Sequence, residues 1–262
     1  TFRVLLLVIL MVISPMAFSL SESVRLFCLQ CACGISLILL TLSTTEVDAG
    51  FFRKRLYLIF GLTVCAAVIS PAGRWWSVGI AVLSFADSAL WLSGHLKSAR
   101  LLLTVLAALT IVSIVRYGAG WQEEVTRICS ALVIGVHLVA MLLGHEYLVW
   151  PGMALTPLKR LLILLLMILA LRGALSLVGT VNWWTRPLDF SIDLSPHLTT
   201  GLILARLFVG ILGPLILGML AWQTAKIGST QSATGILYAA VALTLFGELS
   251  AQLLSQQLGI LL

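Results

Sequence analysis

Five ionisable residues interrupt long apolar stretches of this 262-residue chain: Asp87, His137, Arg172, Arg206 and Glu248. A charged side chain in the hydrocarbon core of a bilayer is costly unless it is paired or hydrated, so such residues usually serve a function. Measured along the helices that must carry them, Asp87 and His137 are expected near mid-depth, and the other three between the middle and the outer surface. These five are the candidates for binding a quinone or handling protons.

Arg172, Arg206 and Glu248 form a set whose charges can satisfy one another. Both guanidiniums can donate to the carboxylate, and the surplus positive charge favours an anionic or electron-rich ligand. We name a quinone first, because its carbonyl oxygens accept hydrogen bonds from Arg or His, its ring needs an apolar cleft, and Glu248 can relay protons. Gln252, one turn after Glu248, and Tyr238 extend the polar side of that helix. The alternative is an ion-pair network that only holds the helices together.

Histidine pairs suggest a second cofactor hypothesis. In helical bundles, b-type haem is held by two imidazoles on facing helices. Only His95 and His145 are expected at matching depth, near the cytoplasmic ends of their helices. We therefore favour interfacial or hydrogen-bonded roles for these two histidines over ligation of haem b.

The cysteines give no convincing metal site. Cys28, Cys31 and Cys33 form a short cluster, but an iron–sulfur centre usually needs four thiolates, and Cys65 and Cys129 lie far along the chain. Small buried hydrophobes are the favoured role, with a redox disulfide as the alternative. No phosphate loop, nucleotide fingerprint or Ser/His/Asp signature is found in the sequence, so we expect no metal and no soluble-type catalytic domain.

The elements that position these residues must be membrane helices. Hydrophobic residues make up 60% of the chain and charged residues 10%, with a mean hydropathy of +1.11. In hydrocarbon every backbone polar group needs an internal partner, which restricts the chain to helices or a closed barrel. Long apolar runs such as Leu161–Leu171 and, apart from Arg206, Leu202–Leu220 favour helices, because barrel strands would alternate apolar and polar residues. The predicted fold class is all-α, a polytopic transmembrane helix bundle.

The lengths of the apolar segments predict about nine spans, because a helix needs roughly 20 apolar residues to cross a bilayer. The chain is treated as one integral membrane domain, 1–262, with two possible sub-bundles at about 1–117 and 126–256. Short connections make sequential helices antiparallel neighbours. The expected helices are Phe2–Leu20, Val24–Ser43, Leu56–Ser70, Trp76–Gly94, Leu101–Tyr117, Thr126–Val149, Leu161–Thr180, Leu198–Trp222 and Gly235–Gln256.

The basic residues predict the orientation of this bundle. The net charge is +6, but Lys and Arg are scattered at the ends of apolar runs, which excludes a nucleic-acid-binding face and is typical of membrane topology. One set of alternate loops holds nine Lys and Arg residues and the other set holds five. We therefore expect the larger set, together with the N-terminus, in the cytoplasm, and the chain in the inner membrane of a bacterial cell. The cytoplasmic set is Arg3, Arg53, Lys54, Arg55, Lys97, Arg100, Lys159, Arg160 and Lys226, and the outer set is Arg25, Arg74, Arg116, Arg127 and Arg186.

Two segments outside the spans carry polar and aromatic groups. Val181–His197 contains paired tryptophans, which indicates an element lying at the outer interface, either a connecting loop or a docking surface for an external subunit. Gly144–Tyr147, at the inner interface, is explained by a cytoplasmic contact or by anchoring of a helix end.

The end of the sequence resembles the C-terminal end of the membrane anchor subunits of the dimethyl sulfoxide reductase and polysulfide reductase class. This resemblance covers about a quarter of the chain. The resemblance implies a multi-spanning subunit without mandatory haem, which holds quinol and passes electrons to an iron–sulfur partner outside the bilayer. The matching features are the Arg206 helix, Leu204–Trp222, a short turn, and an apolar helix with Phe246, Gly247, Glu248 and Leu249.

We therefore expect an integral membrane subunit of a respiratory or photosynthetic-type redox complex. Its partners would be lipid and other membrane and peripheral subunits, and its role that of a quinone-site or non-catalytic subunit rather than a complete enzyme. Two alternatives stay open. One is a small-solute or ion transporter, in which Gly210, Gly213 and Pro214 would break or hinge their helix. The other is a purely structural or assembly subunit.

Overall fold

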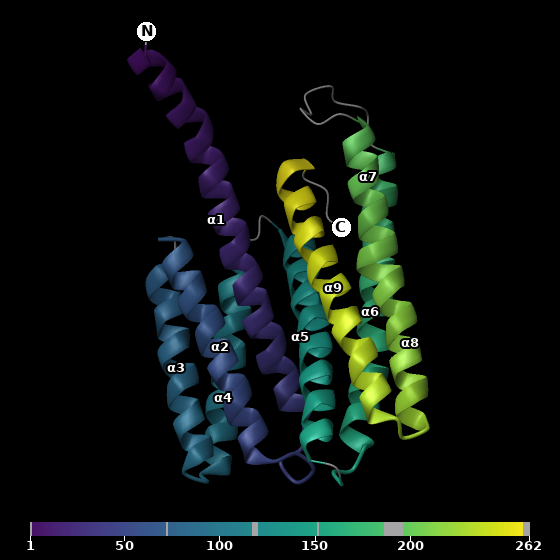
Figure 1. The fold of residues 1–262 in the computed structure, drawn as a ribbon. Helices are drawn as coiled ribbons and strands as arrows, with labels where there is room; N and C mark the ends of the chain where they lie inside the picture. Colours follow the sequence, from purple (N-terminus) through teal and green to yellow (C-terminus); the bar gives the residue numbers. More distant parts are fainter. Residues whose placement is uncertain (1, 72, 117–119, 151, 186–195, 259–262) are drawn as a thin grey trace.

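The computed structural model of the chain describes residues 2–71, 73–116, 120–150, 152–185 and 196–258 (Figure 1). Every regular element within these ranges is helical, which confirms the all-α class. The elements are α1 (Phe2–Thr41), α2 (Ala49–Ile69), α3 (Arg74–Leu92), α4 (Leu96–Val115), α5 (Trp121–Val149), α6 (Thr156–Trp184), α7 (Pro196–Leu207), a π-helix η1 (Phe208–Leu212), α8 (Gly213–Lys226) and α9 (Thr230–Leu258).

Seven helical segments among the described residues are long and apolar enough to cross a bilayer. They are the Leu20–Thr41 part of α1, then α3, α4, α5, most of α6, the run from α7 through η1 to the end of α8, and most of α9. The helix α2 is not among these segments, although it has 21 residues. Three consecutive basic residues, Arg53, Lys54 and Arg55, lie in its second turn. A multi-pass helical membrane protein is thus supported, whereas the predicted count of nine spans is not confirmed.

The helices predicted at 2–20 and 24–43 form the single helix α1, so the prediction of two antiparallel neighbours there is wrong. Ser21–Ser23, between them, contains neither Gly nor Pro, and Glu22 pairs with Arg25 within the helix at 2.7 Å. At ~1.5 Å per residue, α1 spans ~60 Å, about twice the hydrocarbon core. Arg3 therefore lies at the opposite end of α1 from Thr41, and the cytoplasmic N-terminus, which depended on a separate first span, is not confirmed.

The helices α1 and α5 cross at the centre of the bundle. Their backbones touch at Gly34 and Gly135, where a Cβ on either glycine would overlap backbone atoms of the other helix. Only small residues permit so close an approach. In Figure 1, α2, α3 and α4 lie on one side of this crossing, and α6, α7 and α8 on the other, with α9 packed against α5 and α8. The helices of the second group carry the candidate site.

Candidate functional site

Arg172, Arg206 and Glu248 meet in the interior of the bundle, as the sequence predicted. Arg206 Nη2 donates to Glu248 Oε1 at 2.8 Å. Arg172 donates from Nη2 to Oε2 at 3.2 Å and from Nε to Oε1 at 3.3 Å. The three side chains are at most 3% exposed and join α6, α7 and α9. We call these three residues the charged triad.

The helix α5 supplies a fourth side chain, since Arg172 Nη2 also donates to Ser130 Oγ at 3.0 Å. The helices α5 and α9 run antiparallel in a steady register. Gly144 of α5 lies against Thr234 of α9. Ser130 precedes Gly144 by as many residues as Glu248 follows Thr234, and both side chains have Arg172 as a partner. This spacing is a multiple of seven, which keeps one face of each helix toward the other. The register therefore presents Glu248 to α5 and α6.

The chain leaves the regular α-helix soon after Arg206. In η1 the N–H of Gly213 donates to Phe208 O, five residues earlier. The next residue, Pro214, has no N–H, so the carbonyl of Gly210 loses its usual α-helical donor. A π-turn adds one residue to a helix and is frequent at functional sites. Here it sets the direction of Arg206 relative to α8. The π-turn includes Gly210 and leads directly into Gly213 and Pro214, but the helical run Ile203–Lys226 continues through it, so the break or hinge considered for a transporter stays a prediction.

Gly210 of η1 and Gly247 of α9 let two backbones touch beside the charged triad. A Cβ on Gly210 would lie 2.8 Å from Gly247 Cα and 3.1 Å from Arg206 Nη1. The guanidinium thus occupies space that larger residues would fill. Its Nε and Nη1 have no hydrogen-bond partner among the described residues.

The charged triad carries a net charge of one positive unit, from two guanidiniums and one carboxylate. In a low-dielectric interior, the two adjacent guanidiniums favour the ionised form of the Glu248 carboxyl, because each places a positive charge within hydrogen-bond distance of it. Glu248 is therefore suited to anchoring the two arginines, and poorly suited to the proton relay predicted for it. The surplus positive charge still favours an electron-rich ligand.

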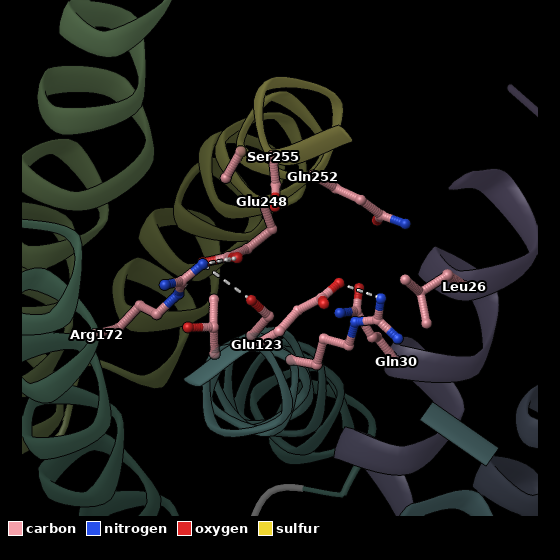
Figure 2. A pocket seen from close by; sticks show the side chains of 11 residues that line it. Leu26, Gln30, Glu123, Arg172, Glu248, Gln252 and Ser255 are labelled. Atoms are coloured by element: carbon pink, nitrogen blue, oxygen red, sulfur yellow. Dashed lines mark hydrogen bonds and ion pairs between the residues drawn. The ribbon is translucent and has the colours of Figure 1, made fainter. Parts of the chain in front are cut away.

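A polar cleft is lined by two members of the charged triad, Arg172 and Glu248 (Figure 2). Its other lining residues lie toward the end of the bundle where α5 begins and α9 ends. The cleft holds about 50 Å³ of space, room for one or two water molecules at roughly 30 Å³ each. In Figure 2, Arg172 and Glu248 lie opposite Leu26 and Gln30 of α1. The lining residues are Leu26, Gln30, Glu123, Thr126, Arg127, Ser130, Arg172, Glu248, Ala251, Gln252 and Ser255.

Two polar contacts bound this cleft. Gln252 Nε2 donates to the carbonyl of Ser23 at 2.8 Å and so joins α9 to α1. Arg127 pairs with Glu123 on α5 and donates to Ile114 O of α4 at 3.0 Å. The prediction that Gln252 extends the polar side of α9 is thus confirmed.

His137 lies on the α5 face that carries Ser130, two turns further into the bundle, and does not line the cleft. It is fully buried, with Nδ1 2.8 Å from Val133 O. Its Nε2 has no hydrogen-bond partner within the ranges that the structure describes. The structure therefore places His137 near the charged triad along α5, without a contact to it.

Asp87 is not brought to the charged triad. It lies on α3, on the other side of the α1–α5 crossing, little more than one turn before Leu92. This position is nearer the helix end than the predicted mid-depth. Asp87 is fully buried.

The two histidines considered for haem have different neighbours. His95 is exposed, with Nδ1 3.0 Å from Ser93 Oγ, and precedes α4. His145 is exposed on α5, with Nδ1 3.4 Å from the hydroxyl of Tyr238 on α9. These contacts agree with hydrogen-bonded, interfacial histidines and give haem ligation no support. Tyr238 contacts His145 rather than the cleft.

Sequence reasoning missed three residues of the cleft wall, Glu123, Arg127 and Ser130. The signal of the first two was available, because Glu123 and Arg127 form an i,i+4 pair of opposite charge beside the start of a predicted span, whereas Ser130 gave none. Sequence reasoning also missed the ion pairs of Glu146 with two basic residues of α2, of which Arg55 is buried and Lys54 exposed. Glu146 lies 2.9 Å from Lys54 Nζ and 3.5 Å from Arg55 Nη2, which ties α5 to α2 and supports the helix-anchor interpretation of Gly144–Tyr147.

The remaining sequence candidates add little to the site. Cys31 and Cys33 are buried and Cys28 half-buried, as the packing role predicts, and all five cysteines are free thiols. The helix α6 runs to Trp184, but most of the predicted interfacial element Val181–His197 lies outside the described residues. Comparison with known proteins found no matching family model, curated protein or solved structure. The resemblance to reductase anchor subunits therefore stays a hypothesis.

Proposed function

We propose that the protein is an integral membrane subunit of a redox complex and that its polar cleft binds the headgroup of a quinone. One observation carries the proposal: the buried charged triad, with its net positive charge, contributes Arg172 and Glu248 to the wall of a polar cleft. A quinone carbonyl would accept a hydrogen bond from Arg172, the arginine on the cleft wall. Glu248 would hold that guanidinium in place rather than exchange protons.

The cleft must widen to admit a ring, since its present space suits one or two water molecules. The contact best placed to yield is Gln252 with the carbonyl of Ser23, because α1 and α9 pack against each other far less than α5 and α9 do. Leu26 and Ala251 supply apolar walls for the ring. We therefore place the entry of the headgroup between α1 and α9.

Quinone binding to the purified protein tests the proposal. Arg172→Gln removes the guanidinium and its positive charge and shortens the side chain, while Glu248 keeps Arg206 as a partner, so the buried carboxylate stays compensated. We expect this variant to bind a short-chain quinone about tenfold more weakly or worse, equivalent to ~1.4 kcal/mol, by calorimetric titration. The control is Arg160→Gln, since Arg160 is exposed and pairs with Glu46 away from the cleft. Absence of binding by the wild-type protein would refute quinone as the ligand, and equal affinities would remove Arg172 from the site.

The second candidate function is transport of a small solute or ion, which the π-turn at η1 favours. A helix interrupted beside buried charges is a common feature of substrate sites in transporters. Solute flux through the isolated chain in liposomes would support transport, whereas copurification of redox-active subunits after mild detergent extraction would support the first proposal. A purely structural subunit would show neither.

For orientation, we propose that the end of the bundle holding the α1–α2, α3–α4 and α8–α9 connections faces the cytoplasm of a bacterial inner membrane. Apart from the charged triad, eight described basic residues lie toward this end and four toward the other, among side chains that the structure describes. The Phe2 end of α1 then lies on the far side, opposite to the sequence-based prediction. The eight are Arg53, Lys54, Arg55, Lys97, Arg100, Lys159, Arg160 and Lys226.

A further inference from the structure

Asp87 is a buried carboxyl that the proposed quinone cleft does not use. It lies on α3 and is fully buried. Neither Oδ1 nor Oδ2 has a hydrogen-bond partner in the part of the chain that the structure describes. An ionised carboxylate without a partner is very costly in such surroundings, whereas a neutral carboxyl costs far less. The environment of Asp87 therefore favours its protonated form.

The charged groups around α3 do not compensate Asp87. The helix packs against α2 and α4. Arg55 of α2 instead donates to Leu142 O at 3.1 Å and pairs with Glu146, and Arg100 of α4 donates to carbonyls at the end of α1. On α3 itself, Arg74 donates to a carbonyl of α2. The other titratable groups on or next to these helices are half-buried or exposed: Arg53, Lys54, Tyr57, Cys65, His95, Lys97 and Arg116.

Both protonation states of Asp87 have suitable partners within one helical turn. Ser84, three residues before Asp87 on the same face of α3, is buried and donates its own hydroxyl proton to Ala81 O, so its oxygen can accept a hydrogen bond from a protonated carboxyl. Trp91 lies one turn after Asp87, and its buried Nε1 has no hydrogen-bond partner among the described residues. Its ring is stacked on Phe52 at 4.4 Å, which holds the indole donor in place for an ionised carboxylate.

We propose that Asp87 is a proton-binding site of the α2–α4 half of the protein. Its carboxyl is protonated at neutral pH in the resting state, and it releases and regains this proton during the working cycle. The site is independent of the proposed quinone cleft, because it lies across the α1–α5 crossing from the charged triad. Its ligand is a proton rather than a metal ion.

Dicyclohexylcarbodiimide tests this proposal, because it reacts with protonated carboxyls in apolar surroundings. The carboxyl oxygen bonds to the central carbon of the reagent, the carboxyl proton moves to a nitrogen, and rearrangement leaves a stable N-acylurea. The full chain is purified in detergent, treated at acidic, neutral and alkaline pH, and analysed by peptide mass spectrometry. We expect modification of Asp87 that declines as the pH rises, and loss of this modification in Asp87→Asn but not in Asp87→Glu.

Glu248 is the control within the same chain, since its two guanidinium partners keep it ionised and therefore unreactive. Infrared spectroscopy gives a readout that does not depend on access of the reagent. The carbonyl band of a protonated carboxyl should be present in the wild-type protein at neutral pH and missing in Asp87→Asn. Absence of that band from the wild type would overturn the proposal. Protection of Asp87 by sodium at constant pH would also overturn it, because it would identify a metal cation as the ligand.

Discussion

Glu248 is the side chain on which the charged triad depends most. It accepts from both buried arginines, and each of its oxygens is used. Removal of one member of a buried ion pair leaves the other as an uncompensated charge, which costs more than the pair contributes. Two guanidiniums would be left in this state if the carboxylate were lost.

At the residue scale we therefore predict that Glu248→Gln destabilises the protein by about 3–5 kcal/mol. The substitution keeps the shape of the side chain and removes only its charge. Thermal unfolding in detergent, followed by intrinsic tryptophan fluorescence, measures the loss. Glu46→Gln is the matched control, because Glu46 pairs with the exposed Arg160 and such pairs contribute about 0–1 kcal/mol. Similar unfolding midpoints for the two variants would contradict the prediction.

The sequence predicted the members of the charged triad but not their surroundings. Arg172, Arg206 and Glu248 stand out because each interrupts an apolar run, and polar groups in hydrocarbon seek one another. Ser130 does not stand out in the same way, since a lone serine is common in membrane helices. The separation of His137 and Asp87 from the charged triad depends on helix rotation and on the order of packing, which composition does not determine.

The contact between η1 and α9 governs how closely the Arg206 helix approaches Glu248. Gly210 and Gly247 allow backbone contact there, and the guanidinium of Arg206 lies against both. Close approach of this kind depends on the absence of side chains.

At the scale of elements we predict that Gly247→Ala separates η1 from α9 and weakens the Arg206–Glu248 ion pair. A Cβ at this position would overlap the Cα of Gly210. Gly235→Ala is the control on the same helix, since no atom lies within 4 Å of a Cβ there, and it should be neutral or stabilising by up to ~1 kcal/mol. Unfolding midpoints of the two variants give the comparison. Equal stability would mean that the crossing tolerates an extra methyl group.

Most helices were predictable because their connections contain clear signals. The turns between α3 and α4 and between α8 and α9 each contain a glycine with positive φ, at 78° for Gly94 and 82° for Gly228. The division of α1 was wrong because Ser21–Ser23 looks polar enough for a turn but contains no residue that ends a helix. Gly210, Gly213 and Pro214 marked the region of the π-turn as a possible break or hinge in a transporter, but the sequence did not predict a π-turn within a continuous helical run.

At the scale of the whole molecule the orientation is the first property to test. We predict that Ser98→Cys lies on the cytoplasmic side and Gln122→Cys on the opposite side, in a background without the native cysteines. Both positions are exposed and lie near opposite ends of the bundle. In intact cells an impermeant maleimide should label only Gln122→Cys, and Ser98→Cys should react after permeabilisation. The reverse pattern would invert the proposed topology.

The order of synthesis gives the charged triad a further consequence. Arg172 is translated before Arg206, and Glu248 comes last. While the chain is growing, α6 must enter the bilayer before its counter-ion exists, although an arginine at mid-span costs about 2.5–3.5 kcal/mol on insertion scales. Among the candidate spans in the part of the chain that the structure describes, α6 has the highest mean hydropathy, which offsets this cost. The two buried arginines therefore gain their counter-ion only when α9 is inserted, and a nascent chain interrupted before α9 would be a substrate for membrane quality control.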